Sequence, residues 1–141
     1  MYRNVARHIP DVPASAQWYR RIIGRARRHV PAIPSALSIA LVDDDEMRTL
    51  NRQSRNLDKI TDVLSFLYEP NEGEIIVCVP QAMRQYARFK SASIREELCR
   101  LMVHGALHLA GYDHTQRNER LLMESMTKKI LNSLSESGEG Q

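Results

Sequence analysis

The sequence has little of what marks secreted, membrane or fibrous proteins. Its two cysteines, Cys78 and Cys99, stand in apolar surroundings without a C-x-x-C pair, which indicates buried and inert thiols. The longest uninterrupted apolar run covers only residues 75–79, whereas a membrane-spanning helix needs roughly 20. The N-terminus has no apolar core of the kind found in signal peptides. We therefore expect a cytoplasmic protein with no membrane partner.

The length and composition are those of one globular domain. The 141 residues fit the roughly 100–200 of a single domain, enough to bury a core without disulfides. Hydrophobic residues make up 43% and charged residues 26%, which excludes collagen-like, coiled-coil and wholly disordered chains. We expect a single catalytic domain over residues 1–134. Residues 135–141 have nothing to bury and are expected to form a disordered tail.

The net charge of +3 is unevenly distributed along the chain. Residues 1–34 contain seven arginines and one acidic residue, Asp11, and therefore carry +6. Such a basic segment suits a polyanionic partner such as nucleic acid. It would equally suit a solvated helix face whose long arginine stems cover apolar neighbours. The charge alone leaves both interpretations open.

The hydrophobic pattern predicts an α+β fold in which about five helices pack on a small mixed sheet. Strands are expected at 37–42, 63–68 and 74–79, the last two joined as a hairpin by the turn 70–73. Helices are expected at 11–30, 43–52, 80–89, 93–110 and 116–134. The polar residues 53–61 show no periodicity and predict a loop. The last helix is expected to bury Leu122, Met126, Ile130 and Leu134.

Two capping boxes predict where helices begin. Asp43 precedes Glu46 by three residues, and Ser93 precedes Glu96 in the same way. The acidic run 43–46 could also suggest a metal site. At a helix N-terminus, however, the macrodipole favours acidic residues, so capping is the better interpretation.

Three of the five histidines fall within residues 104–114. The i, i+4 spacing places His104 and His108 on one helix face, one above the other. Gly111 can adopt a left-handed conformation, so the chain can turn back and bring His114 to the same point. Three imidazoles with a fourth position open form the coordination set of a catalytic zinc. We expect one Zn²⁺ per chain, although the same ligands also suit nickel, iron or copper.

The same histidine spacing occurs in the metzincin proteases, where a glutamate follows the first histidine as general base. Here that position is Gly105, which has no side chain. This argues against peptide hydrolysis and leaves a zinc-dependent amide or ester hydrolase as a rival hypothesis. A metal without that glutamate still lowers the pKa of water toward 7 and can polarise a phosphoryl oxygen. Asp113 either supports a ligand through a hydrogen bond or bonds its own turn.

Residues 104–114 resemble the H-G-x-L-H-L-x-G-Y-D-H signature of the YbeY-type endoribonucleases, the bacterial rRNA maturation factors. Upstream, residues 50–66 are similar to the family's L-N-x-x-[YF]-R-x-x-D-x-P-T-[DN]-V-L-S-F-P, whose last position is Leu67 here. Gly73-Glu74-Ile75 stands where the family usually has G-D-I. The resemblance covers roughly residues 35–134, and the N-terminal helix matches only in type.

The resemblance implies a metal-dependent, single-strand-specific endoribonuclease acting in 16S rRNA maturation and ribosome quality control. It implies a zinc held by His104, His108 and His114, with His114 and Arg55 as catalytic residues. Taken alone, Arg55 would be a loop arginine facing water, but across the cleft its planar fork would clamp the scissile phosphate. Thr61, Asp62 and Ser65 are expected to shape the cleft wall.

The implied partners are single-stranded RNA and the small ribosomal subunit with its proteins, and no DNA is expected. The chain has only one Trp, five Tyr and two Phe, several of them in core-like positions. We therefore expect no stacking platform, and RNA binding that is mainly electrostatic and falls steeply with salt. The non-enzymatic rival is an RNA- or ribosome-binding assembly factor with a structural zinc. Cys78 or Cys99 would then have to complete the site, and no spacing indicates that.

The sequence departs from the family pattern at four positions. Ser54 replaces an aromatic residue, Ile60 and Leu67 replace prolines, and Thr115 stands where an acid is frequent. Because proline fixes φ and limits the unfolded chain, its loss is expected to loosen the loop that holds Arg55. None of the four positions is a predicted metal ligand.

Overall fold

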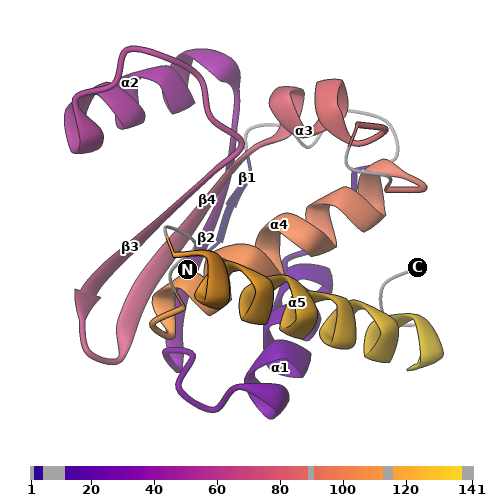
Figure 1. Ribbon diagram of the computed structural model, residues 1–141. Helices are drawn as coiled ribbons and strands as arrows, with labels where there is room; N and C mark the ends of the chain where they lie inside the picture. Colours follow the sequence, from indigo (N-terminus) through magenta and orange to yellow (C-terminus); the bar gives the residue numbers. More distant parts are fainter. Residues whose placement is uncertain (1, 5–11, 89–90, 113–115, 138–141) are drawn as a thin grey trace.

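The computed structural model describes residues 2–4, 12–88, 91–112 and 116–137. The described part contains a four-stranded sheet and five helices, which confirms the predicted α+β class (Figure 1). The strands are β1 (Tyr2–Asn4), β2 (Ala36–Val42), β3 (Val63–Glu69) and β4 (Glu72–Cys78). The helices are α1 (Ala16–His29), α2 (Asp44–Arg55), α3 (Val79–Gln85), α4 (Ile94–Leu109) and α5 (Arg117–Ser137).

The sheet is mixed, with strand order β1-β2-β4-β3. β1, β2 and β4 run parallel, and β3 pairs antiparallel with β4 as the predicted hairpin. β3 is therefore an edge strand. Helices α1, α4 and α5 lie on one side of the sheet and α2 on the other (Figure 1).

The alternation of side chains along the central strands builds two cores. On one face, Ile39, Leu41, Ile75 and Val77 join the buried side chains of α1, α4 and α5 in a large cluster. The other face carries a small cluster in which Met47 of α2 is buried. The small cluster consists of Ala40, Val42, Met47, Leu64, Ile76 and Cys78. The site described below lies where these two layers meet at the β3 edge.

Both predicted capping residues cap their helices. The Asp43 carboxylate accepts a hydrogen bond from the Glu46 amide at 2.9 Å, and the Ser93 hydroxyl accepts one from the Glu96 amide at 3.2 Å. The prediction of buried thiols is also confirmed, because Cys78 and Cys99 are both buried and unbridged. Burial raises the pKa of each thiol to about 12.

Helix boundaries differ from the predictions at several places. Helix α1 begins at Ala16, because the Ser15 hydroxyl caps it by accepting from the Gln17 amide at 3.2 Å. Val12 and Pro13 are buried but lie before the helix. Helix α3 ends at Gln85 rather than near residue 89. Strand β1 has no counterpart in the prediction, since three residues show no alternation and pair only with the distant β2. Residue 11 and residues 89–90 lie outside the described part.

Helix α5 continues to Ser137, three residues beyond its predicted end. The prediction that Leu122 is buried is wrong, because its side chain is 62% exposed while Met123 is buried. Leu121, Leu122 and Met123 are consecutive, so the apolar pattern allowed a one-residue error in helical phase. Ile130 and Leu134 are buried as predicted, and Met126 is half-buried. Residues 138–141 of the predicted tail lie outside the described part.

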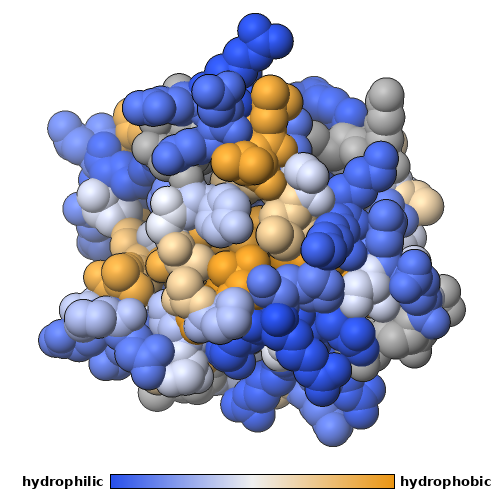
Figure 2. Space-filling model, turned by 60° about the horizontal axis from the view of Figure 1, so that its bottom comes forward, coloured by the Kyte–Doolittle hydropathy of each residue, from blue (hydrophilic) through white to orange (hydrophobic). Residues whose placement is uncertain are grey.

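The arginines of α1 divide between the two interpretations of the basic segment. Arg25 and Arg27 are half-buried and donate to Ser133 Oγ at 3.0 Å and to the Pro34 carbonyl at 2.7 Å. Arg20, Arg21 and Arg28 are exposed. Figure 2 shows one face of the molecule, on which apolar residues form an interrupted area among hydrophilic ones. No helix within the described ranges is both long and apolar enough to cross a membrane.

Candidate active site

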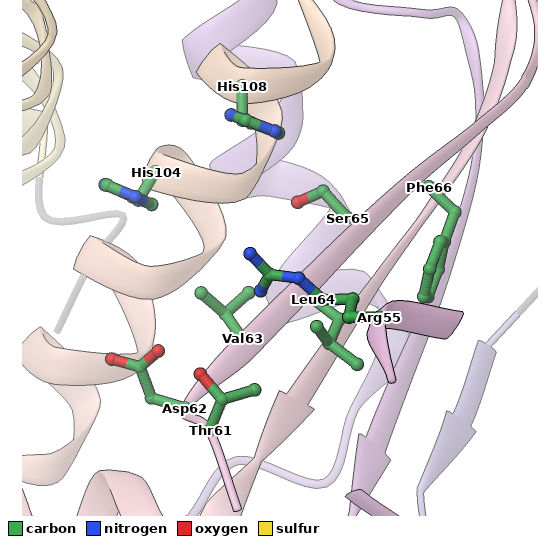
Figure 3. A pocket seen from close by; sticks show the side chains of 9 residues that line it. All are labelled: Arg55, Thr61, Asp62, Val63, Leu64, Ser65, Phe66, His104 and His108. Carbon is green, nitrogen blue, oxygen red and sulfur yellow. The ribbon is translucent and has the colours of Figure 1, made fainter. Parts of the chain in front are cut away.

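A cavity of about 280 Å³ lies at the β3 edge, between the end of α2 and the middle of α4 (Figure 3). It brings together three predicted site residues that are far apart in sequence, Arg55, His104 and His108. The rest of the described wall consists of residues 61–66, which lead into β3 and form its beginning. The fourth predicted site residue, His114, lies outside the described residues, as do Asp113 and Thr115.

Helix α4 presents the two histidines on one face, as the i, i+4 spacing predicts (Figure 3). His104 is half-buried, and His108 is exposed. The helix ends as predicted at Gly111, whose φ of 105° is left-handed. The Gly111 amide donates to the His108 carbonyl and the Tyr112 amide to the Leu107 carbonyl, both at 3.1 Å. These two bonds close the C-terminal end of the helix.

Gly105 lets α4 lie directly on the hairpin. A Cβ at this position would lie 3.0 Å from Ile75 Cγ2 and 3.0 Å from Ser65 Oγ. The Ser65 hydroxyl donates to the Gly105 carbonyl at 3.3 Å, which joins β3 to the helix between the two histidines. The missing side chain therefore sets how close the histidine-bearing helix comes to the cavity wall.

Arg55 is the last residue of α2 and not part of a loop, contrary to the prediction for residues 53–61. The helix ends because Asn56 adopts a left-handed conformation with φ 57° and its amide bonds the Arg52 carbonyl at 3.1 Å. The last turn of α2 extends beyond the core and contains no apolar residue, so the hydrophobic pattern did not predict it. In Figure 3 the Arg55 guanidinium extends over β3 toward the helix that carries His104 and His108.

Polar contacts hold the segment after Arg55, where the family usually has a proline. The fully buried Asn51 donates from Nδ2 to the Lys59 carbonyl at 3.0 Å. Arg48 binds both carboxylate oxygens of Asp58, at 2.8 and 3.1 Å, and its hydrogen bonds lower the pKa of Asp58. The Cys78 amide donates to the Asp62 carbonyl at 2.8 Å. These contacts oppose the looseness expected from the loss of proline.

A buried polar network fixes Asp62 on the cavity wall. Gln85 Nε2 donates to Asp62 Oδ2 at 2.7 Å and to Glu97 Oε2 at 3.0 Å. Glu97 is fully buried and also accepts from Ser91 Oγ and from the Arg100 guanidinium, at 2.7 to 2.8 Å. Burial raises the pKa of Glu97, but the hydrogen bonds from Arg100, Gln85 and Ser91 outweigh it and leave the pKa below its ordinary value.

The sequence pattern did not predict this network. Its signal is Glu97 itself, which falls on the apolar face of α4 among Ile94, Leu98 and Leu101. An acidic residue in such a position requires partners, because burying an unpaired charge is costly.

The described residues supply two of the three predicted metal ligands. Within the described ranges no group of three potential ligand side chains comes together. His104 and His108 are nevertheless a fitting pair, because they share one helix face at the wall of an open cavity. The left-handed Gly111 then ends the helix three residues after His108.

The chain is similar to proteins of one known family. The family model described as Endoribonuclease YbeY matches residues 4–135. Endoribonuclease YbeY of Colwellia psychrerythraea is 39% identical over 105 residues, which cover 70% of this chain and 67% of the relative. Endoribonuclease YbeY of Macrococcus caseolyticus is 31% identical over 140 residues, covering 91% and 86% respectively. The solution structure of TM1509 from Thermotoga maritima shares the fold, with a TM-score of 0.60, 23% identity and coverage of 100% and 96%. Since the family model spans nearly all of the sequence, cavity residues included, and these relatives are 31–39% identical, this chain belongs to the endoribonuclease YbeY family.

Proposed function

We propose that this protein is a metal-dependent endoribonuclease that cleaves single-stranded RNA in 16S rRNA maturation and ribosome quality control. The observation that carries the proposal is the convergence of Arg55, His104 and His108 on one open cavity. A cation opposite two imidazoles suits a phosphodiester, which carries one negative charge and gains more at the transition state. Membership of an endoribonuclease family supports the same reaction class.

The metal-binding residues in this proposal are His104, His108 and His114. Three imidazoles are a typical donor set for a catalytic zinc, so Zn²⁺ is the metal we propose, one per chain. When bound, zinc lowers the pKa of a water molecule toward 7 and polarises a phosphoryl oxygen. The exposure of His108 leaves this side of the cavity accessible to a polymeric substrate.

Arg55 supplies the positive charge on the opposite wall. A guanidinium stays protonated and offers a planar fork that fits two phosphate oxygens. In its position at the end of α2 it would orient the scissile phosphate and stabilise the added charge of the pentacoordinate state. His114 completes the proposed catalytic set with Arg55.

The packing of Gly105 argues against the rival amide or ester hydrolase. In metzincins a glutamate at this position activates water. Here Ile75 and Ser65 occupy the space that any side chain at residue 105 would need. A carboxylate could enter only if α4 moved away from the hairpin.

The buried cysteines argue against the rival assembly factor with a structural zinc. That role would need Cys78 or Cys99 as a fourth ligand. Cys78 belongs to the small core on the other face of the sheet, where its thiol donates to Asp44. Cys99 belongs to the large core, and neither thiol lines the cavity.

The proposed partners are single-stranded RNA and the small ribosomal subunit with its proteins, in the cytoplasm. The exposed arginines of α1, namely Arg20, Arg21 and Arg28, would follow the RNA backbone. Such binding would weaken as salt rises, because each phosphate contact releases a counterion.

The test is cleavage of an end-labelled single-stranded RNA by wild type, His108→Ala and His29→Ala, all purified identically. His29 is the matched control, because its ring bonds the Arg25 carbonyl on α1 and lies outside the cavity. We expect wild type and His29→Ala to cleave and His108→Ala to be inactive. Equal cleavage by all three proteins would reveal a contaminating nuclease. The proposal would be overturned if wild type cleaved neither free RNA nor the RNA of small subunits.

A further inference from the structure

A second hollow, the α4–α5 groove, adjoins the cavity. It has a volume of about 450 Å³ and lies between the middle of α4 and residues 120–131 of α5. His104 lines both the groove and the cavity that contains Arg55. A chain held in the cavity could therefore continue into the groove without leaving the protein surface.

The floor of the groove is apolar. Met123 is buried, and Leu131 is half-buried. Between them, the Thr127 hydroxyl donates to the Met123 carbonyl at 2.8 Å, so this polar group is satisfied by its own helix. No aromatic side chain is among the described lining residues. A flat ligand would consequently pack on aliphatic groups and not on a ring.

Positive charges surround this floor. Arg100 lies on the α4 side, where its charge is paired with Glu97, and Arg120 and Lys128 are exposed on α5. Arg120 and Lys128 are eight residues apart, about 12 Å along a helix, so the groove lies between two cations. Neither takes part in any of the ion pairs found among the described residues. The only carboxylate in the described lining, Glu124, can accept from the amino group of a base.

We infer that the α4–α5 groove is an RNA subsite, which binds a nucleotide that flanks the scissile bond. This inference rests on the proposed function. A nucleotide combines a flat, weakly polar base with an anionic phosphate, and the groove combines an apolar floor with flanking cations. A purely apolar ligand would leave the cations unused, and a free phosphate would leave the floor unused. The shared His104 places this subsite next to the cavity.

Adjacent lysines allow a matched test. Lys128 lines the groove, whereas Lys129 is also exposed but does not line it. Lys128→Ala and Lys129→Ala therefore remove the same charge. Binding of a fluorescein-labelled single-stranded RNA is measured by anisotropy over a salt series, and a gel checks that the RNA is intact. We expect Lys128→Ala to weaken binding about fivefold and to reduce the slope of log K against log salt by about 0.7, the share of one phosphate contact. Lys129→Ala should match wild type in both.

A second pair of variants tests the apolar floor. Thr127→Phe fills the groove, while Ser125→Phe adds the same ring at an exposed position outside it. We expect Thr127→Phe to raise KM about tenfold at unchanged kcat, because the contact is made equally in the bound and transition states. Ser125→Phe should leave KM unchanged, and thermal unfolding checks that both variants are folded.

The outcomes separate this inference from the proposed function. If wild type neither binds nor cleaves RNA, the proposed function fails. If wild type cleaves but the two lysine variants behave alike and the two phenylalanine variants behave alike, the subsite is refuted and the nuclease stands. If Thr127→Phe spares RNA binding but abolishes binding to small subunits stripped of free RNA, the groove docks a protein instead, which also refutes the subsite.

Discussion

Gly105 and Gly24 provide the sharpest prediction, because the same substitution should change stability in opposite directions. Both glycines lie inside helices, α4 and α1 respectively. Replacing a helical glycine by alanine stabilises by about 1 kcal/mol through helix propensity alone. At Gly24 a Cβ meets nothing within 4 Å, so Gly24→Ala should raise the free energy of unfolding by up to about 1 kcal/mol.

At Gly105 the added methyl group meets side chains at 3.0 Å on two sides. Ser65 can rotate, at the loss of its hydrogen bond to the Gly105 carbonyl, worth about 0.5–1.5 kcal/mol. Ile75 is fully buried and cannot move freely, and overpacking of this kind costs about 1–3 kcal/mol. These costs exceed the propensity gain, so Gly105→Ala should lower the free energy of unfolding by about 1–2 kcal/mol.

The measurement is urea unfolding of wild type and both variants, with RNA cleavage assayed in parallel under conditions where all three are folded. Because α4 must shift to admit the methyl group, Gly105→Ala should also lose cleavage, while Gly24→Ala keeps it. If Gly105→Ala is as stable as Gly24→Ala and fully active, the inferred close contact between α4 and the hairpin is wrong.

Three further predictions concern the charge, the metal and the buried network. Arg55→Lys keeps the charge but loses the planar fork, so cleavage should fall at least tenfold with little change in RNA affinity. The control is Arg52→Lys, on the same helix turn but outside the cavity, which should cleave nearly as fast as wild type. Equal cleavage rates for the two variants would argue against a bidentate phosphate contact. Removing the metal with a chelator should abolish cleavage, and added Zn²⁺ should restore it. The circular dichroism spectrum should stay unchanged throughout. Loss of the fold on chelation would instead favour the rival with a structural zinc. Glu97→Gln should destabilise by about 3 kcal/mol at pH 7, because Arg100 is left without its buried partner. The folded pKa of Glu97 is lowered, so its contribution is present above the ordinary range near 4.3 and lost as pH falls below it, and the variant should show a flatter acid limb in urea unfolding against pH.

The features that the sequence predicts correctly each depend on residues close together in the chain. The histidine pair depends on helix periodicity, the turn after it on one glycine, and the two helix starts on capping boxes, and each of these codes spans only a few residues. The adjacency of Arg55 to the histidines came from a family resemblance, since no local pattern relates residues about 50 positions apart.

The features that the prediction missed depend on distant partners or on weak local signals. β1 exists through its pairing with β2 and carries no pattern of its own. The end of α2 depends on the left-handed Asn56, in a polar stretch where periodicity gives no signal. Gln85 acquires its role only because Asp62 and Glu97, from two other elements, meet at its amide.

The location of the cavity at a seam between two layers has a consequence for folding cooperativity. Arg55 belongs to the α2 layer, which rests on the small cluster around Met47, and the histidines belong to the α4 layer and the large cluster. Local openings of a native protein begin where few apolar contacts hold an element. A transient detachment of α2 would therefore remove the guanidinium while the histidine pair stays ordered. We therefore expect the stability of the smaller core to limit the fraction of molecules competent for cleavage. Hydrogen exchange in α2 would report this fraction more directly than global unfolding does.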